Sequence, residues 1–174
     1  MNKLIFLPRL QRERDKFELL LNRAGFLRQL TMAGVFPNLS IKDLLADVLS
    51  REQFIGDRLS EVLHGERYAP CVSHSALENF QKENGYPDYE SPLCRREKPH
   101  PFVVEKYKNV SLDDIVEQEL AAYINVVSAI ERLTQNQCLD YDLFHRVGEQ
   151  TYKTYRRASA EIQRWQKSIA AEPK

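Results

Sequence analysis

Acidic side chains on otherwise apolar helix faces are the residues of this chain best suited to chemistry. Asp47 flanks an apolar stripe, with Arg51 one turn later, so it is suited to act as a general base or as a polar anchor in a pocket. The alternative is an i,i+4 ion pair worth about a few tenths of a kcal/mol. Glu119 lies near a second stripe, where a carboxyl group facing the interior must find a donor or shift its pKa. It is a candidate catalytic acid, and a salt bridge from a neighbouring helix is the alternative.

Hydroxyl groups at helical spacing extend this candidate site. Tyr123 and Tyr155 are suited to present hydroxyls to a ligand between helices, although tyrosines on such faces also serve as packing residues with one satisfied hydroxyl. Thr154 and Ala158 lie one turn apart on the same apolar face. We therefore predict a ligand pocket between the helices, lined by Asp47, Arg51, Tyr123, Thr154, Tyr155 and Ala158.

No other residues form a recognisable catalytic motif or cofactor site. The cysteines Cys71, Cys94 and Cys138 are odd in number and lack CxxC spacing, which favours reduced thiols. The four histidines have no i,i+4 partner. Gly-x-Ser-x-Gly, Walker A and GxGxxG patterns are absent from the sequence. We predict no cofactor.

Length and charge exclude several classes of protein. A chain of 174 residues suits one domain with a single core, spanning 1–174. Lysine plus arginine equals aspartate plus glutamate at 25 each, so no net field favours nucleic acid or an anionic membrane. No segment approaches the roughly 20 apolar residues that span a bilayer. We expect a cytoplasmic protein.

Four amphipathic segments predict an all-α fold. The first helix is expected from near Pro8 to near Gly25, and the second follows Ser40 and ends near 64–65. The third follows Ser111, and the fourth covers roughly 151–169. The apolar stripe of the third helix is predicted to contain Leu112, Val116, Leu120, Tyr123, Val127 and Ile130. That of the fourth is predicted to contain Thr151, Thr154, Tyr155, Ala158, Ile162, Trp165 and Ile169. Burying four such stripes together gives a four-helix bundle.

The long connection at residues 65–110 separates the second helix from the third. Five prolines punctuate it, and Ser75 with Glu78 forms a candidate capping box that opens a short helix toward Gln81. A connection of this length often shapes a binding site or a partner surface. The alternative is a crossover that ties the two helices together.

Two stretches resemble a known family. The sequence from Ser40 to Asp47, Ser-Ile-Lys-Asp-Leu-Leu-Ala-Asp, resembles the opening of the second helix in DinB-like proteins. The sequence from Tyr155 to Trp165 resembles the last helix of the DfsB and colibactin self-protection branch. The resemblance implies a DinB-like four-helix bundle with a long crossover between its second and third helices, and homodimers are common among such proteins.

The same resemblance bears on metal and function. Metal-binding members carry a histidine at the end of the helix-two motif and a His-x3-His pair on the last helix, and here Asp47, Thr154 and Ala158 fill those positions. A threonine hydroxyl is a poor zinc ligand and alanine offers none, so we predict no metal. The branch implies a metal-independent, hydrolase-like protective (resistance) role toward a reactive small molecule. The alternative is a non-catalytic interaction protein that acts through a homodimer or partner surface, with residues 65–110 as a candidate contact.

Overall fold

The described part of the chain is helical and contains no strands, which confirms the prediction of an all-α fold. The structure is a computed structural model that describes residues 1–24 and 39–171, and the side chains of Ile169 and Ala171 lie outside that description. None of the described helices is both long enough and apolar enough to cross a membrane.

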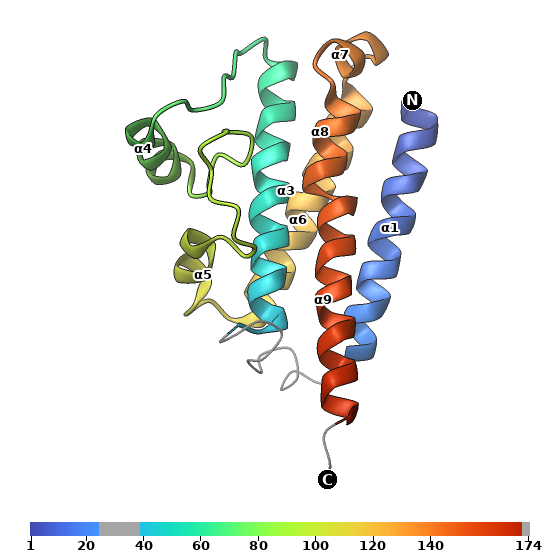
Figure 1. The fold of residues 1–174 in the computed structure, drawn as a ribbon. Coiled ribbons are helices and arrows are strands. Elements are labelled where there is room, and N and C mark those ends of the chain that lie inside the picture. The colour runs from blue at the N-terminus through green and yellow to red at the C-terminus, as the bar shows by residue number, and fades with distance from the viewer. Residues whose placement is uncertain (25–38, 172–174) are drawn as a thin grey trace.

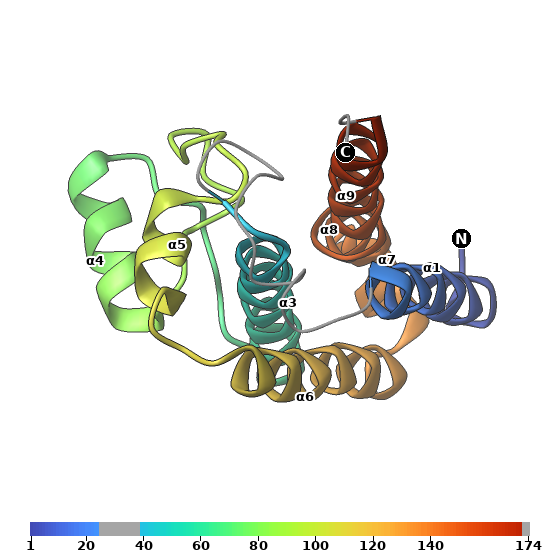
Figure 2. The ribbon, with the colours of Figure 1, turned by 90° about the horizontal axis from the view of Figure 1, so that it is seen from below.

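Long helices lie side by side as a bundle (Figure 1). They are α1 (Lys3–Ala24), α3 (Ile41–Leu63), α6 (Leu112–Arg132) and α9 (Tyr152–Ala171), with α8 (Leu143–Gln150) leading into α9. Helices α3 and α6 run in one direction, whereas α1 and α9 run in the other (Figure 1). Seen from below, α3 and α6 are neighbours, and α1 lies beside α9 (Figure 2). The inward faces of the four long helices therefore form one core.

The starts of α3 and α6 are set by local capping, as the sequence predicts. The Ser40 hydroxyl accepts a hydrogen bond from the Asp43 amide, while the Asp43 carboxylate accepts one from the Ser40 amide at 2.7 Å. Ser111 likewise accepts from the Asp114 amide at 3.1 Å. Each cap satisfies amide groups that have no partner within the helix.

The first helix begins earlier than predicted. It starts at Lys3, so Pro8 lies inside the helix rather than in its first turn. The Asn2 side chain accepts a hydrogen bond from the Ile5 amide, and Phe6 is fully buried in the core. Anchoring by Phe6 outweighs the loss of the one helical hydrogen bond that proline cannot donate. The predicted end near Gly25 lies outside the described residues.

The predicted stripe of the third helix is wrong in part. Leu112, Tyr123 and Ile130 are buried, but Val116 and Leu120 are each 48% exposed. The face of α6 that packs against α3 instead contains Ile115, Ala122 and Val126. Val116 and Leu120 therefore lie on the outer side of α6.

The segment predicted as a single fourth helix is interrupted. Thr151, at φ −116° and ψ −95°, separates α8 from α9. A short helix α7 (Gln135–Asp140) precedes them and holds the buried Cys138. The predicted buried face of α9 is confirmed at Thr154, Tyr155, Ala158, Ile162 and Trp165.

The long connection packs against the outer side of α3 (Figures 1 and 2). It contains α4 (His74–Asn84) and α5 (Pro101–Tyr107). The predicted short helix exists, but Ser73 rather than Ser75 caps it, by accepting from the Ala76 amide at 3.1 Å. Helix α5, which packs on α3, was not predicted.

Candidate functional site

A fully buried carboxyl group lies in the middle of the bundle. Glu52 of α3 is 0% exposed. Its Oε2 atom accepts a hydrogen bond from the Tyr155 hydroxyl of α9 at 2.8 Å and lies 3.7 Å from Arg14 Nη1 of α1. Its Oε1 atom has no hydrogen-bond partner. An acid placed this deep is costly unless it is neutral or fully paired.

Arg14 connects Glu52 to a second carboxyl group. Its guanidinium donates two hydrogen bonds to Glu119 of α6, one of them from Nη2 to Oε2 at 2.6 Å. It also lies 3.1 Å from the more exposed Glu18 and stacks on the Tyr123 ring, 4.2 Å from its centroid. Carboxyl groups from three helices, α1, α3 and α6, thus converge on one arginine. We call Arg14, Glu52, Glu119 and Tyr155 the central acid cluster.

The surroundings of Glu52 favour its protonated form. Burial, followed by the negative charge of Glu119, raises the pKa of Glu52 well above its ordinary value, against the opposing effects of Arg14 and Tyr155. The protonated form of Glu52 has a donor of its own. Burial lowers the pKa of Arg14, but Glu119 and Glu52 outweigh burial and raise it overall. The cluster therefore combines an acid whose pKa is raised with an arginine whose pKa is also raised.

Two surface hollows reach the central acid cluster from different sides. The first has a volume of about 550 Å³ between α3 and α6, and its lining includes Glu52, Gly56, Ala122 and Arg132. The second, of about 360 Å³, has apolar walls that include Leu45 and Leu120, and Arg14, Glu18 and Glu119 also line it. The first hollow is lined mostly by polar residues, among them Asp57, Ser60 and Asn125. The second has the usual form of a small-molecule site, which is mostly apolar with a few convergent polar groups.

Asp47 and Arg51 belong to a separate polar group at the contact of α3 with α8. Arg51 Nε donates to Asp47 Oδ2 at 3.0 Å, and Arg51 Nη1 donates to Gln150 Oε1 at 3.3 Å. The guanidinium stacks on the Tyr89 ring, 4.2 Å from its centroid. On α9, Thr154 donates to the Glu149 carbonyl at 3.0 Å. No hydrogen bond or ion pair within the described ranges joins this group to the central acid cluster.

The residues at the positions where the DinB-like resemblance would place metal ligands do not fit a metal ion. Asp47 is paired with Arg51, and the Thr154 hydroxyl accepts a hydrogen bond from Arg157 Nη2 at 3.0 Å. Ala158 has no ligand atom. Two guanidinium groups would also repel a cation. Within residues 1–24 and 39–171, no three His, Cys, Asp or Glu side chains are grouped so as to hold one.

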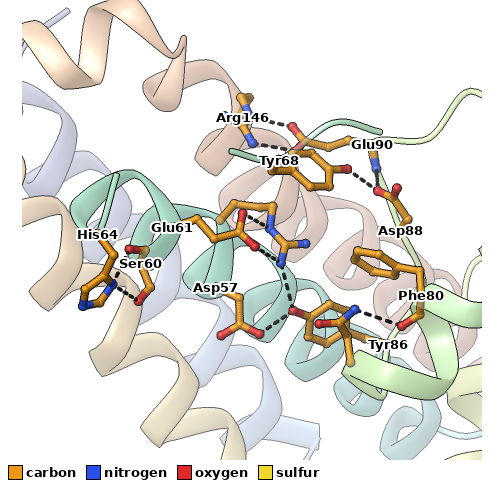
Figure 3. A network of polar contacts seen from close by, with 12 residues as sticks. Asp57, Ser60, Glu61, His64, Tyr68, Phe80, Tyr86, Asp88, Glu90 and Arg146 are labelled. Atoms are coloured by element: carbon orange, nitrogen blue, oxygen red, sulfur yellow. Dashed lines mark hydrogen bonds and ion pairs between the residues drawn. The ribbon is translucent and has the colours of Figure 1, made fainter. Parts of the chain in front are cut away.

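A third polar network fixes the long connection to the bundle (Figure 3). Arg58 of α3 is buried, stacks on the rings of Phe54 and Tyr68, and donates to both carboxylate oxygens of Glu61. Arg146 of α8 forms two hydrogen bonds with Glu90, at 2.6 and 2.8 Å. The buried Asp88 carboxylate accepts from the Tyr68 hydroxyl and from the Cys71 amide. These contacts explain the ordered path of the connection, so we assign this network to structure.

The predicted site residues divide between two places. Glu119, Tyr123 and Tyr155 lie around Arg14 and Glu52, whereas Asp47 and Arg51 lie at the α3–α8 contact, with Thr154 on α9. The ion pairs considered as alternatives for Asp47 and Glu119 are both present.

Sequence reasoning missed Glu52 and Arg14. Each occupies a position in an apolar stripe, Glu52 between Val48 and Ile55, and Arg14 between Leu10 and Phe17. A charged residue in register with a core stripe is the signal that identifies both.

Comparisons with known proteins bear on the fold of this chain and not on its chemistry. No family model and no curated protein matches this chain. Among solved structures, it resembles the crystal structure of an uncharacterised protein from Escherichia coli UTI89, with a TM-score of 0.68 and 13% identity over 99% of this chain and 96% of that one. At this identity the likeness shows a shared fold over essentially the whole length.

Proposed function

We propose that this protein is a DinB-like bundle of the DfsB and colibactin self-protection branch that binds a reactive small molecule and hydrolyses it with acid assistance from Glu52. The observation that carries the proposal is the fully buried Glu52, whose Oε1 lacks a hydrogen-bond partner and which is among the residues that line a hollow of about 550 Å³. A raised carboxyl pKa at a cavity marks candidate general acids. The stretches Ser40–Asp47 and Tyr155–Trp165 support the family assignment.

The proposed reaction assigns one role to each member of the central acid cluster. Glu52 gives its proton to the atom that leaves the broken bond. A water molecule then supplies hydroxide to the carbon and returns its remaining proton to Glu52. Tyr155 and Arg14 stabilise the carboxylate that exists between these steps, since one donates a hydrogen bond and the other carries positive charge. Glu119 holds Arg14 in place through paired hydrogen bonds.

Consumption of reactive compounds by the purified protein tests this proposal. The full chain is incubated with a panel of small electrophiles such as epoxides and aziridines, and mass spectrometry follows loss of each compound and gain of one water. We expect a consumed compound for which Glu52→Gln lowers the rate at least about 100-fold, the lower range of general acid catalysis. Glu83→Gln, on the exposed face of α4, is the matched control. Circular dichroism confirms folding.

The same assay separates Glu52 from Asp47. Asp47→Asn is expected to keep most of the activity, because no contact joins Asp47 to the central acid cluster. If activity survives in Glu52→Gln but is lost in Asp47→Asn, the catalytic acid lies at the α3–α8 contact and not in the central acid cluster. Full activity in both variants contradicts a role for either acid.

An exposed apolar stripe on α6 favours a second candidate function, assembly with another protein or a second copy. Val116, Leu120 and Ile124 follow one another at i,i+4 spacing and are 48%, 48% and 55% exposed. Light scattering on the wild type and on Leu120→Lys tests it. A dimer that the substitution dissociates supports assembly, whereas a monomer in both cases excludes a homodimer through this face.

A further inference from the structure

Three cationic side chains lie around a single buried carboxylate where α3 meets α8 and α9. Arg51 is buried beside Asp47, and Arg157 is half-buried on α9 with Nη2 on the Thr154 hydroxyl. The more exposed Lys98 belongs to the long connection. In related bundles this position suits a cation, but here the protein supplies the positive charge itself.

The positive charges of this group are not balanced. Burial, then the charge of Arg51, lowers the pKa of Arg157, and burial followed by Arg157 and Arg51 lowers the pKa of Lys98. These shifts show that the three cations are close enough to repel one another. Among the described residues, neither Arg157 nor Lys98 has a carboxylate within 4 Å. Residues 25–38 contain no aspartate or glutamate in the sequence. Asp47 and Glu149 oppose these shifts by attraction, so three cations share two carboxylates within the described residues.

One carboxylate oxygen of this group also lacks a hydrogen-bond donor. Asp47 is 5% exposed, and its Oδ1 atom has no partner while Oδ2 is held by Arg51. A buried carboxylate oxygen without a donor is costly. Arg51 Nη2 and Arg157 Nη1 are guanidinium donors that form no hydrogen bond within the described residues. Within the described residues, this polar group thus contains guanidinium donors and a carboxylate oxygen that have no hydrogen-bond partner.

We infer that Asp47, Arg51 and Arg157 form a binding site for a phosphate group that carries or adjoins an O–H group. Phosphate oxygens accept from the guanidinium groups, since arginine geometry suits them. The O–H of hydrogenphosphate, or a hydroxyl beside the phosphate of a small ester, donates to Asp47 Oδ1. Sulfate matches phosphate in shape but has no proton at neutral pH, so it would leave Asp47 Oδ1 unpaired and facing an anion. This site stands whether or not the hydrolase proposal holds.

Isothermal titration of the full chain with inorganic phosphate, sulfate and glycerol 3-phosphate at constant ionic strength tests the inference. We expect saturable one-to-one binding of phosphate and at least tenfold weaker binding of sulfate. Tighter binding of glycerol 3-phosphate than of phosphate identifies an ester as the better ligand, and the reverse order identifies the free ion. Arg157→Gln is expected to weaken phosphate binding about tenfold or more, the effect of losing one charge-assisted hydrogen bond.

The neighbouring residue provides a matched control. Arg156 is exposed, pairs with Glu13 on α1 and faces away from Asp47, so Arg156→Gln is expected to leave phosphate binding unchanged. Asp47→Asn gives the site an amide donor and should bring sulfate binding up to or above that of phosphate. Asp47→Asn removes the partner of the buried Arg51, so this variant could fail to fold. In that case two results decide the question: the effect of Arg157→Gln, and the ratio of phosphate to sulfate affinity of the wild type.

Three outcomes would overturn the inference. One is the absence of saturable phosphate binding at about 10 mM, which lies above the range of weak specific binding. Another is equal affinity for phosphate and sulfate in the wild type. The third is an equal loss in Arg156→Gln and Arg157→Gln, which would indicate nonspecific attraction to the surface of α9.

Discussion

The Tyr155 hydroxyl of α9 donates a hydrogen bond to Glu52 Oε2 of α3 at 2.8 Å, inside the bundle. The tyrosine ring is itself fixed, because it stacks on Phe17 of α1 with centroids 5.4 Å apart and an interplanar angle of 7°. One side chain therefore joins three helices and supplies the partner of the most buried acid. Tyr155 therefore contributes both to the packing of the core and to the hydrogen bonding of Glu52.

Tyr155→Phe separates the hydroxyl from the ring. The phenylalanine keeps the stacking on Phe17 but leaves Glu52 Oε2 without its donor, so we expect a loss of about 1–3 kcal/mol in the free energy of unfolding. Urea unfolding at neutral pH measures it. Tyr152→Phe is the control, since no hydrogen bond of the Tyr152 hydroxyl is found in the described part of the chain, and it should change stability by less than about 0.5 kcal/mol. Equal effects in the two variants would contradict the role of the Tyr155 hydroxyl.

The raised pKa of Glu52 makes stability depend on pH. The folded protein holds a proton that the unfolded chain releases above the ordinary value of 4.5. The contribution of Glu52 is therefore fully present below that value and is lost as the pH rises through the raised pKa of the folded state. Glu52→Gln, neutral at every pH, removes this dependence.

Paired urea titrations from about pH 4 to pH 8 measure the effect. The stability of Glu52→Gln relative to wild type should rise with pH, with a slope of at most about 1.4 kcal/mol per pH unit for one proton. A difference that stays constant across the range would show that Glu52 has the same pKa in both states.

Arg58 is expected to control the docking of the long connection. Its guanidinium makes two hydrogen bonds to Glu61 and stacks on several rings (Figure 3). Lysine keeps the positive charge but lacks the paired N–H donors and the planar face of a guanidinium. Arg58→Lys should therefore lower the free energy of unfolding by about 1–3 kcal/mol. Hydrogen exchange should accelerate at 68–90 more than in α6. Arg67→Lys, at an exposed position, serves as the control, and equal exchange in both variants would remove Arg58 from this role.

Equilibration with zinc, nickel and manganese tests the metal prediction. Arg51 and Arg157 place positive charge beside the positions where the DinB-like resemblance would place metal ligands, and Ala158 contributes no ligand. We therefore expect no stoichiometric metal after desalting, as measured by elemental analysis. Retention of one metal ion per chain that Asp47→Asn abolishes would reverse this interpretation.

Local signals in the sequence were sufficient for the starts of α3 and α6 but not for contacts between helices. The capping residues Ser40 and Ser111 bond to amides three positions away, so the sequence alone identifies them. Arg14 and Glu119 lie 105 positions apart, and no periodicity shows which buried acid meets which buried base. The exposed Val116 illustrates the same limit, because the face of α6 that is buried depends on how the helix packs against its neighbours.

Gly56 offers a prediction in which stability and activity change in opposite directions. It lies within α3, and a Cβ atom there would meet Val126 Cγ2 at 3.7 Å, an ordinary contact. Gly56→Ala should therefore raise the free energy of unfolding by about 0.5–1 kcal/mol, since glycine loses more backbone entropy in a helix than alanine does. Gly56 also lines the hollow that Glu52 reaches, so the added methyl group narrows the approach to the proposed acid and should lower the rate of hydrolysis. Gly65→Ala gives the opposite stability change, because Gly65 has a φ of +69° that alanine adopts only with strain. A stabilised Gly56→Ala variant with full activity would place the substrate elsewhere than in the α3–α6 hollow.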